Sequence, residues 1–153
     1  MAREYTFYGA ADTTSDDLRS VIAAAVGGSM AADGTIFLEG MYITARSVSP
    51  ADRHSTTLLF GFDHRITVIF RFSNLARGST AEHNTSLMAI AILALFDAYG
   101  EPGVLLYNGE EVILQKLDGG VVFNEDWEEW FEIDDLAPVL AAHARQRLPQ
   151  PLL

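Results

Sequence analysis

The spacing of apolar residues along this chain changes several times, and each spacing predicts a different kind of element. The longest apolar run, Leu87 to Phe96, has ten residues without a polar interruption. Gly100 and Pro102 follow it as helix-stop residues, and four residues before it are good N-caps: Ser79, Thr80, Asn84 and Thr85. Both sides of the predicted helix are apolar, so we expect it to be buried on both sides, as the central core helix.

Other segments read as strands or as amphipathic helix. Residues Thr13 to Ser15 are expected to cap a helix that ends at Gly27-Gly28, because the apolar residues between them recur at helical spacing. Alternation with a period of two predicts strands at Arg3 to Tyr8, Thr35 to Glu39, Met41 to Arg46, Ser55 to Phe60 and Ile66 to Phe72, the last two as a pair.

The part that follows the core helix reads as a meander of three strands and a final helix. The turn Asn108-Gly109 is a strong signal for a type I′ hairpin. The predicted strands are Val104 to Tyr107, Glu111 to Leu117 and Val121 to Phe123, and the predicted helix is Leu136 to Arg147. In that helix Arg145 and Arg147 would lie near the negative end of the helix dipole.

Together these elements predict an α+β fold. It is a mainly antiparallel sheet with a buried central helix and two further helices packed on it. The length of 153 residues fits one domain, which we place at residues 1–148, with residues 149–153 as a flexible C-terminal tail.

Charge narrows the partners that we expect. The net charge of −11 disfavours nucleic acid and anionic membranes, because both require a basic face, and it permits a basic protein partner. An acidic surface that merely keeps the protein in solution is the simpler explanation. The chain has no cysteine, and its N-terminal residues do not read as a secretory signal, so we expect a cytoplasmic location.

The charge is unevenly distributed along the chain. Five arginines lie between Gly40 and Thr80, whereas eleven acids lie between Glu101 and Asp135. From Glu125 to Asp135, which we call the acidic segment, tryptophans alternate with acids. Such alternation is typical of a surface that binds a basic partner. The predicted binding residues are Glu110, Glu111, Glu125, Asp126, Trp127, Glu128, Glu129, Trp130 and Glu132. The alternative is that one or both tryptophans anchor the segment to the core.

No catalytic or metal-binding motif is recognisable. The four histidines are scattered, no serine lies in a nucleophile motif, and the acidic segment lacks the calcium-loop pattern, so we expect no catalytic residues, metal or cofactor. An enzyme whose site is not visible as a motif stays open as an alternative. It would require a deep pocket in which His54, His64, Asp63 and Arg71 converge.

About half the chain resembles the swarm-inhibition (Sit) immunity proteins. The resemblance includes REYTF at the N-terminus, Gly61-Phe62, the strand RITVIFRFSNL, the helix LMAIAILALF, the hairpin VLLYNGEEVILQKLDGGVVFN and the tryptophan-bearing segment, whereas Thr35 to Arg53 departs from it. It implies a protein that neutralises a cognate toxin by binding it, without shared catalytic residues. A chaperone or adaptor for an exported effector is the alternative, and a homodimer stays open.

Overall fold

The structure is a computed structural model that describes residues 3–49, 51, 60–73 and 78–150. Within these residues, nine strands form one sheet in the order β2-β3-β4-β5-β1-β6-β7-β8-β9. The strands are β1 (Arg3–Gly9), β2 (Ser29–Met30), β3 (Ile36–Leu38), β4 (Met41–Ser47), β5 (Ile66–Phe72), β6 (Gly103–Tyr107), β7 (Glu111–Lys116), β8 (Val122–Asn124) and β9 (Ala144–Gln146). All neighbouring pairs are antiparallel except β8 and β9.

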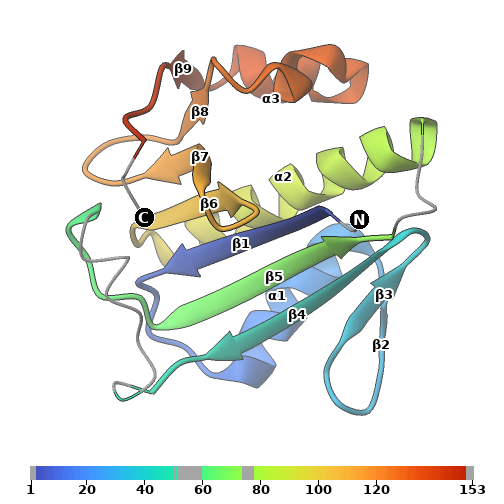
Figure 1. The fold of residues 1–153 in the computed structure, drawn as a ribbon. Helices are drawn as coiled ribbons and strands as arrows, with labels where there is room; N and C mark the ends of the chain where they lie inside the picture. Colours follow the sequence, from blue (N-terminus) through green and yellow to red (C-terminus); the bar gives the residue numbers. More distant parts are fainter. Residues whose placement is uncertain (1–2, 50, 52–59, 74–77, 151–153) are drawn as a thin grey trace.

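Two helices, α1 (Ser15–Val26) and α2 (Ser79–Tyr99), lie against one face of this sheet (Figure 1). Between β8 and β9, the chain forms the 3₁₀ turns η3 (Glu128–Glu132) and η4 (Asp134–Leu136) and a short helix, α3 (Ala137–Ala141). The predicted α+β class with a mainly antiparallel sheet is therefore confirmed.

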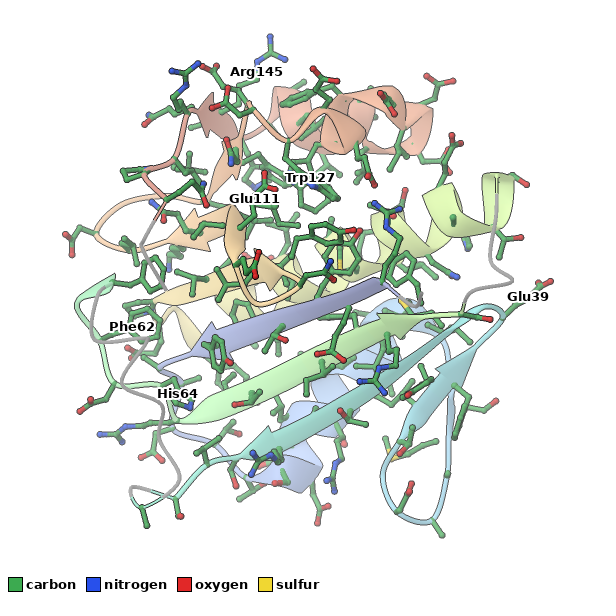
Figure 2. The ribbon with its side chains drawn as sticks, viewed as in Figure 1. Glu39, Phe62, His64, Glu111, Trp127 and Arg145 are labelled. Atoms are coloured by element: carbon green, nitrogen blue, oxygen red, sulfur yellow. The ribbon has the colours of Figure 1, made fainter. Side chains whose placement is uncertain are left out.

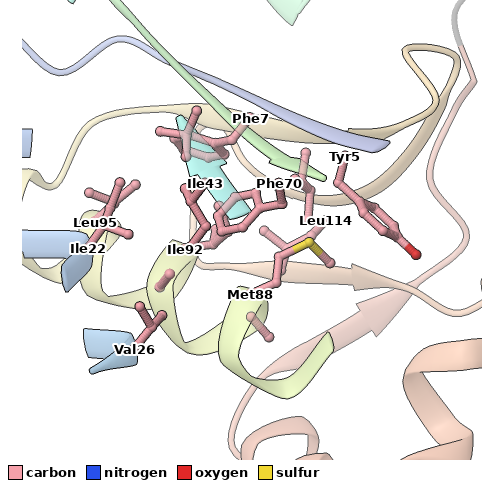
Figure 3. Close-up of a cluster of buried hydrophobic side chains, with 14 of the residues drawn as sticks. Tyr5, Phe7, Ile22, Val26, Ile43, Phe70, Met88, Ile92, Leu95 and Leu114 are labelled. Carbon is pink, nitrogen blue, oxygen red and sulfur yellow. The ribbon is translucent and has the colours of Figure 1, made fainter. Parts of the chain in front are cut away.

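The core forms where the strands turn their apolar positions towards α1 and α2. In β5 the residues Ile66, Val68, Phe70 and Phe72 are buried, and the residues between them face the other side of the sheet. Tyr5 and Phe7 of β1 join the same cluster (Figure 3). Alternation in β1 and β5 thus determines which face of the sheet the helices cover.

The central helix begins differently from the prediction. Its N-cap is Gly78, with φ of 55° and no side-chain hydrogen bond, so none of the four expected capping residues caps it. Asn84 and Thr85 are instead buried inside the helix, where Asn84 Nδ2 donates to the Glu39 carbonyl at 2.8 Å. The helix is also not buried all round, because Ile90 is 39% exposed. Gly100 ends it in the left-handed conformation, as expected.

The hairpin between β6 and β7 has the predicted turn. Asn108 and Gly109 have φ values of 51° and 75°, which is the backbone of a type I′ turn. The register between the two strands shifts next to Leu105, so Ile113 is an extra residue in β7, a β-bulge.

The prediction of a final helix from Leu136 to Arg147 is wrong. Helix α3 ends at Ala141, and Ala144–Gln146 form β9, which pairs in parallel with β8. The Nδ1–H of His143 donates to the Val139 carbonyl at 2.8 Å, and the edge of β8 supplies backbone partners to the residues that follow. Because these residues form a strand, the expected contact of Arg145 and Arg147 with a helix dipole does not exist.

Two further points concern the strands. The predicted strand Ser55 to Phe60 lies, apart from Phe60, outside the described residues. Within the described residues, β5 pairs with β1 and β4. The two-residue strand β2 was not predicted.

The C-terminal residues are attached to the sheet as far as the structure describes them. Leu148 is buried against Leu106 and Val112, and the side chain of Gln150 accepts from Val112 N at 2.8 Å. Of the expected flexible tail, residues 149–153, the last three lie outside the described residues, and Gln150 is tied to β7.

Candidate protein-binding face

Both tryptophans of the acidic segment point into the protein. Trp130 is fully buried, and its indole Nε1–H donates to the Ile113 carbonyl at 2.7 Å. Trp127 is 6% exposed and its ring centroid lies 5.8 Å from that of Tyr5 and 4.8 Å from that of Trp130. The tryptophans therefore anchor the segment to the core and offer little surface to a partner.

The acids around them face outwards. Glu125, Asp126, Glu128 and Glu132 are exposed, and Glu129 is half-buried. Two of these acids form ion pairs within the protein: Glu129 with Arg3, and Asp126 with Arg147, whose Nε lies 2.8 Å from Asp126 Oδ2. Glu128 and Glu132 form no ion pair with a described residue, so their charges are directed at solvent.

The first residues of β1 join this segment to the hairpin that carries Glu110 and Glu111. The side chain of Arg3 binds Glu129. The backbone carbonyl of the next residue, Glu4, accepts a hydrogen bond from the backbone N–H of Asn108 in the hairpin turn, at 2.8 Å. The structure therefore brings the two groups of predicted acids to the same end of β1. We call the carboxylates of both groups, of which Glu111 and Glu129 are half-buried, the acidic face: Glu110, Glu111, Glu125, Asp126, Glu128, Glu129 and Glu132.

A hollow of about 260 Å³ borders the acidic face at Glu129 and Glu132. It is bordered by Arg3 from β1, Glu82 from the first turn of α2, and Glu129 and Glu132 from η3. The place of Glu82 beside Glu129 and Glu132 depends on how the first turn of α2 packs near η3. No signal in the sequence connects residues so far apart.

A second hollow, of about 560 Å³, lies on the other side of η3. Phe131, Leu140 and Ala137 form its apolar part, and Asp134, His143 and Arg145 its polar part. The guanidinium of Arg145 lies over the Phe131 ring, 5.1 Å from the centroid. The surface beside the acids is therefore uneven, with apolar floors that a protein partner can contact.

The residues expected to form an enzyme pocket do not converge where the structure describes them. His64 packs edge-on against the ring of Tyr8, near the end of β1, whereas Arg71 binds Glu4, near its start. Tyr8 lies four positions after Glu4 in the strand, which corresponds to roughly 13 Å. Figure 2 shows His64 at one end of β5, with Glu39 beyond the other end. His54 lies outside the described residues.

Two further searches concern the described part of the chain. No group of three or more histidines or acids is arranged there to hold a metal ion. Among the same residues, no helix has both the length and the apolar character needed to cross a bilayer.

Comparison with known proteins identifies a family. No curated protein and no solved structure matches the chain. A family model described as SitI3-like matches residues 3–134, from the first residue of β1 to the first residue of η4, and thus includes every residue of the acidic face. The chain belongs to the SitI3-like family.

Proposed function

We propose that this chain is an immunity protein that binds a cognate toxin in the cytoplasm and neutralises it by direct contact. The observation that carries the proposal is membership of the SitI3-like family over residues 3–134. This extends the resemblance to swarm-inhibition immunity proteins from a set of separate segments to a continuous match.

The charge of the acidic face supports a basic toxin. Glu110, Glu128 and Glu132 are exposed and have no ion pair with a described residue, and the whole chain carries −11. Such a field attracts a cationic partner and orients it before contact, which raises the association rate.

The contacts that hold these acids in place also support binding. Arg3 holds Glu129, Arg147 holds Asp126, and the buried Trp130 fixes the backbone between them. A face that is already ordered loses less conformational entropy when it binds.

Co-expression tests the proposal. The gene beside this one is expressed alone, with the wild-type chain, and with the variant Glu128→Lys/Glu132→Lys. We expect the neighbouring gene to stop growth and the wild type to restore it. The variant should restore growth poorly, because two charges are reversed and the net charge changes by four units. The matched control, Asp97→Lys/Glu101→Lys, makes the same charge change at the other end of α2, a helix roughly 30 Å long.

Two results would contradict the proposal. If the neighbouring product is harmless and still forms a purified complex, the chain is an adaptor or chaperone and not an immunity protein. If the neighbouring product is toxic and both lysine variants restore growth as well as the wild type, the acidic face is not the toxin-binding face.

A further inference from the structure

Figure 1 shows α1 and α2 on one face of the sheet. The other face carries a row of four side chains from the neighbouring strands β3, β4, β5 and β1. Phe37 of β3 is the register partner of Tyr42 in β4, and Tyr42 is the partner of Arg71 in β5. Arg71 is in turn the partner of Glu4 in β1. Cross-strand partners lie on the same face, so Phe37, Tyr42, Arg71 and Glu4 form one line, which we call the transverse row.

Contacts along the transverse row hold its side chains in place. The rings of Phe37 and Tyr42 have centroids 6.2 Å apart, and the guanidinium of Arg71 lies 5.9 Å from the Tyr42 centroid. Arg71 Nη1 donates to Tyr42 Oη at 3.0 Å, and Arg71 Nε donates to Glu4 Oε2 at 3.0 Å. Phe37 is nevertheless 51% exposed, and the Arg71 side chain is 47% exposed.

A single exposed phenylalanine is ordinary on a protein surface. The transverse row differs because an exposed aromatic ring, a tyrosine and an arginine lie together on a rigid sheet. Aromatic residues and arginine supply most hot spots of protein interfaces, and ordered side chains lose little entropy on binding.

The transverse row ends at the acidic face. Its last residue, Glu4, is hydrogen-bonded through its backbone to Asn108, two residues before Glu110. The row is therefore aromatic at Phe37 and leads, past the ion pair of Arg71 with Glu4, to the acids of the hairpin. A partner that fits it carries an apolar side chain at one end and a basic side chain at the other.

A second copy of the chain does not fit the row. Four strands at about 4.8 Å spacing, with about 6.8 Å between successive residues on one face, offer roughly 130 Å², whereas a stable interface buries about 800 Å² on each partner. Each copy also carries a charge of −11, which opposes self-association. The row is large enough only as one part of a wider interface.

We propose that the transverse row is the apolar anchor of the toxin-binding face. The toxin places an apolar or aromatic side chain against Phe37 and Tyr42, and a lysine or arginine towards the exposed Glu110. This inference rests on the proposed function, since it assigns the row to the same basic toxin that contacts the acidic face.

The test is Phe37→Ser, with binding to the purified toxin encoded beside this gene measured by surface plasmon resonance. We expect a Kd at least tenfold higher, mainly through faster dissociation, and recovery of binding in Phe37→Tyr. Met30→Ser is the matched control, because Met30 is 47% exposed in the neighbouring strand and is the register partner of the buried Ile36, on the opposite face from Phe37. Circular dichroism and thermal unfolding establish that each variant is folded.

The outcomes separate the two proposals. If the wild type binds the toxin and Phe37→Ser binds equally well, the anchor is refuted and the proposed function stands. A loss of affinity of the same size in Met30→Ser would also refute the anchor, because the effect would then come from the β2–β3 pair as a whole and not from the transverse row. If the wild type does not bind the toxin, the proposed function fails, and the anchor fails with it.

Discussion

At the scale of single residues, Tyr5 is a buried polar residue whose polar atom has no role in the fold. Its ring packs between Phe72, Tyr107 and Trp127, with centroid distances of 5.2, 5.1 and 5.8 Å. Its hydroxyl is buried and has no hydrogen-bond partner among the described residues. A buried hydroxyl without a partner destabilises a fold, so the aromatic packing offsets its cost.

Tyr5→Phe is therefore expected to leave the free energy of unfolding unchanged or to raise it by about 1–2 kcal/mol. Burial raises the pKa of Tyr5 above its ordinary value, so the folded state holds this proton more tightly than the unfolded state. Stability from this group is complete below the unfolded pKa of about 10 and falls as the pH rises above it. Urea unfolding at neutral and alkaline pH checks both points. A variant that is less stable at neutral pH, or equally sensitive to alkali, contradicts them.

Gly103 packs so closely against the Phe7 ring that no side chain fits there without moving the ring. A Cβ atom there would lie 2.4 Å from Cζ of Phe7, which is itself buried in the core. Gly103→Ala is expected to lower the free energy of unfolding by about 1–3 kcal/mol, because Phe7 must move. Gly119→Ala is the control, since nothing lies within 4 Å of its Cβ position. Thermal unfolding of the two variants should differ clearly, and equal melting temperatures would contradict the packing argument.

At the scale of elements, the acidic segment is attached to the β-bulge in β7. The bulge leaves Ile113 without a register partner, and its carbonyl accepts the hydrogen bond from Trp130. The carbonyl of Val112 accepts from Asn124 Nδ2 at 2.8 Å and from Gln150 Nε2 at 3.2 Å. The irregular strand thus becomes the attachment site for both η3 and the C-terminal residues.

Trp130→Phe is expected to cost more than Trp127→Phe, although both substitutions remove the same atoms. Only Trp130→Phe leaves the buried Ile113 carbonyl without the indole N–H that donates to it. The unpaired carbonyl adds about 1–3 kcal/mol to the loss in the free energy of unfolding. Trp127 is the control because its indole forms no hydrogen bond with a described residue. Chemical denaturation measures the two losses. A greater loss for Trp127→Phe would show that the hydrogen bond to the bulge is not the important contact.

At the scale of the whole molecule, charge and shape act together. The helices bury one face of the sheet, the transverse row lies on the other, and the acidic face lies at the end of β1 where the two meet. The acids of the acidic face outnumber Arg3 and Arg147, the two arginines that pair with them. This face therefore attracts cations over a distance set by the ionic strength.

Association with the toxin is therefore expected to slow as salt is added, because salt screens the attraction of exposed charges. The dissociation rate should change much less, since it depends on contacts at short range. Stopped-flow kinetics at low and high ionic strength measure both rates. An association rate that is independent of salt would contradict electrostatic attraction.

Much of the fold can be predicted from the sequence, because it depends on local patterns. The alternation in β1 and β5, the Asn108-Gly109 turn and the glycine after α2 each act within a few residues. The net charge and the cluster of acids in the last third of the chain are likewise properties of the sequence alone. These features determined the α+β class and the acids of the candidate site.

Only the tertiary structure decided what depends on residues far apart in the chain. Ala144–Gln146 became a strand because the edge of β8 was available to it, and Trp127 turned inwards because Tyr5 and Tyr107 surround it. The transverse row unites residues 4, 37, 42 and 71, which meet only through the pairing of four strands. Local periodicity carries no information about which strands become neighbours, so this part of the surface appears only when the sheet has formed.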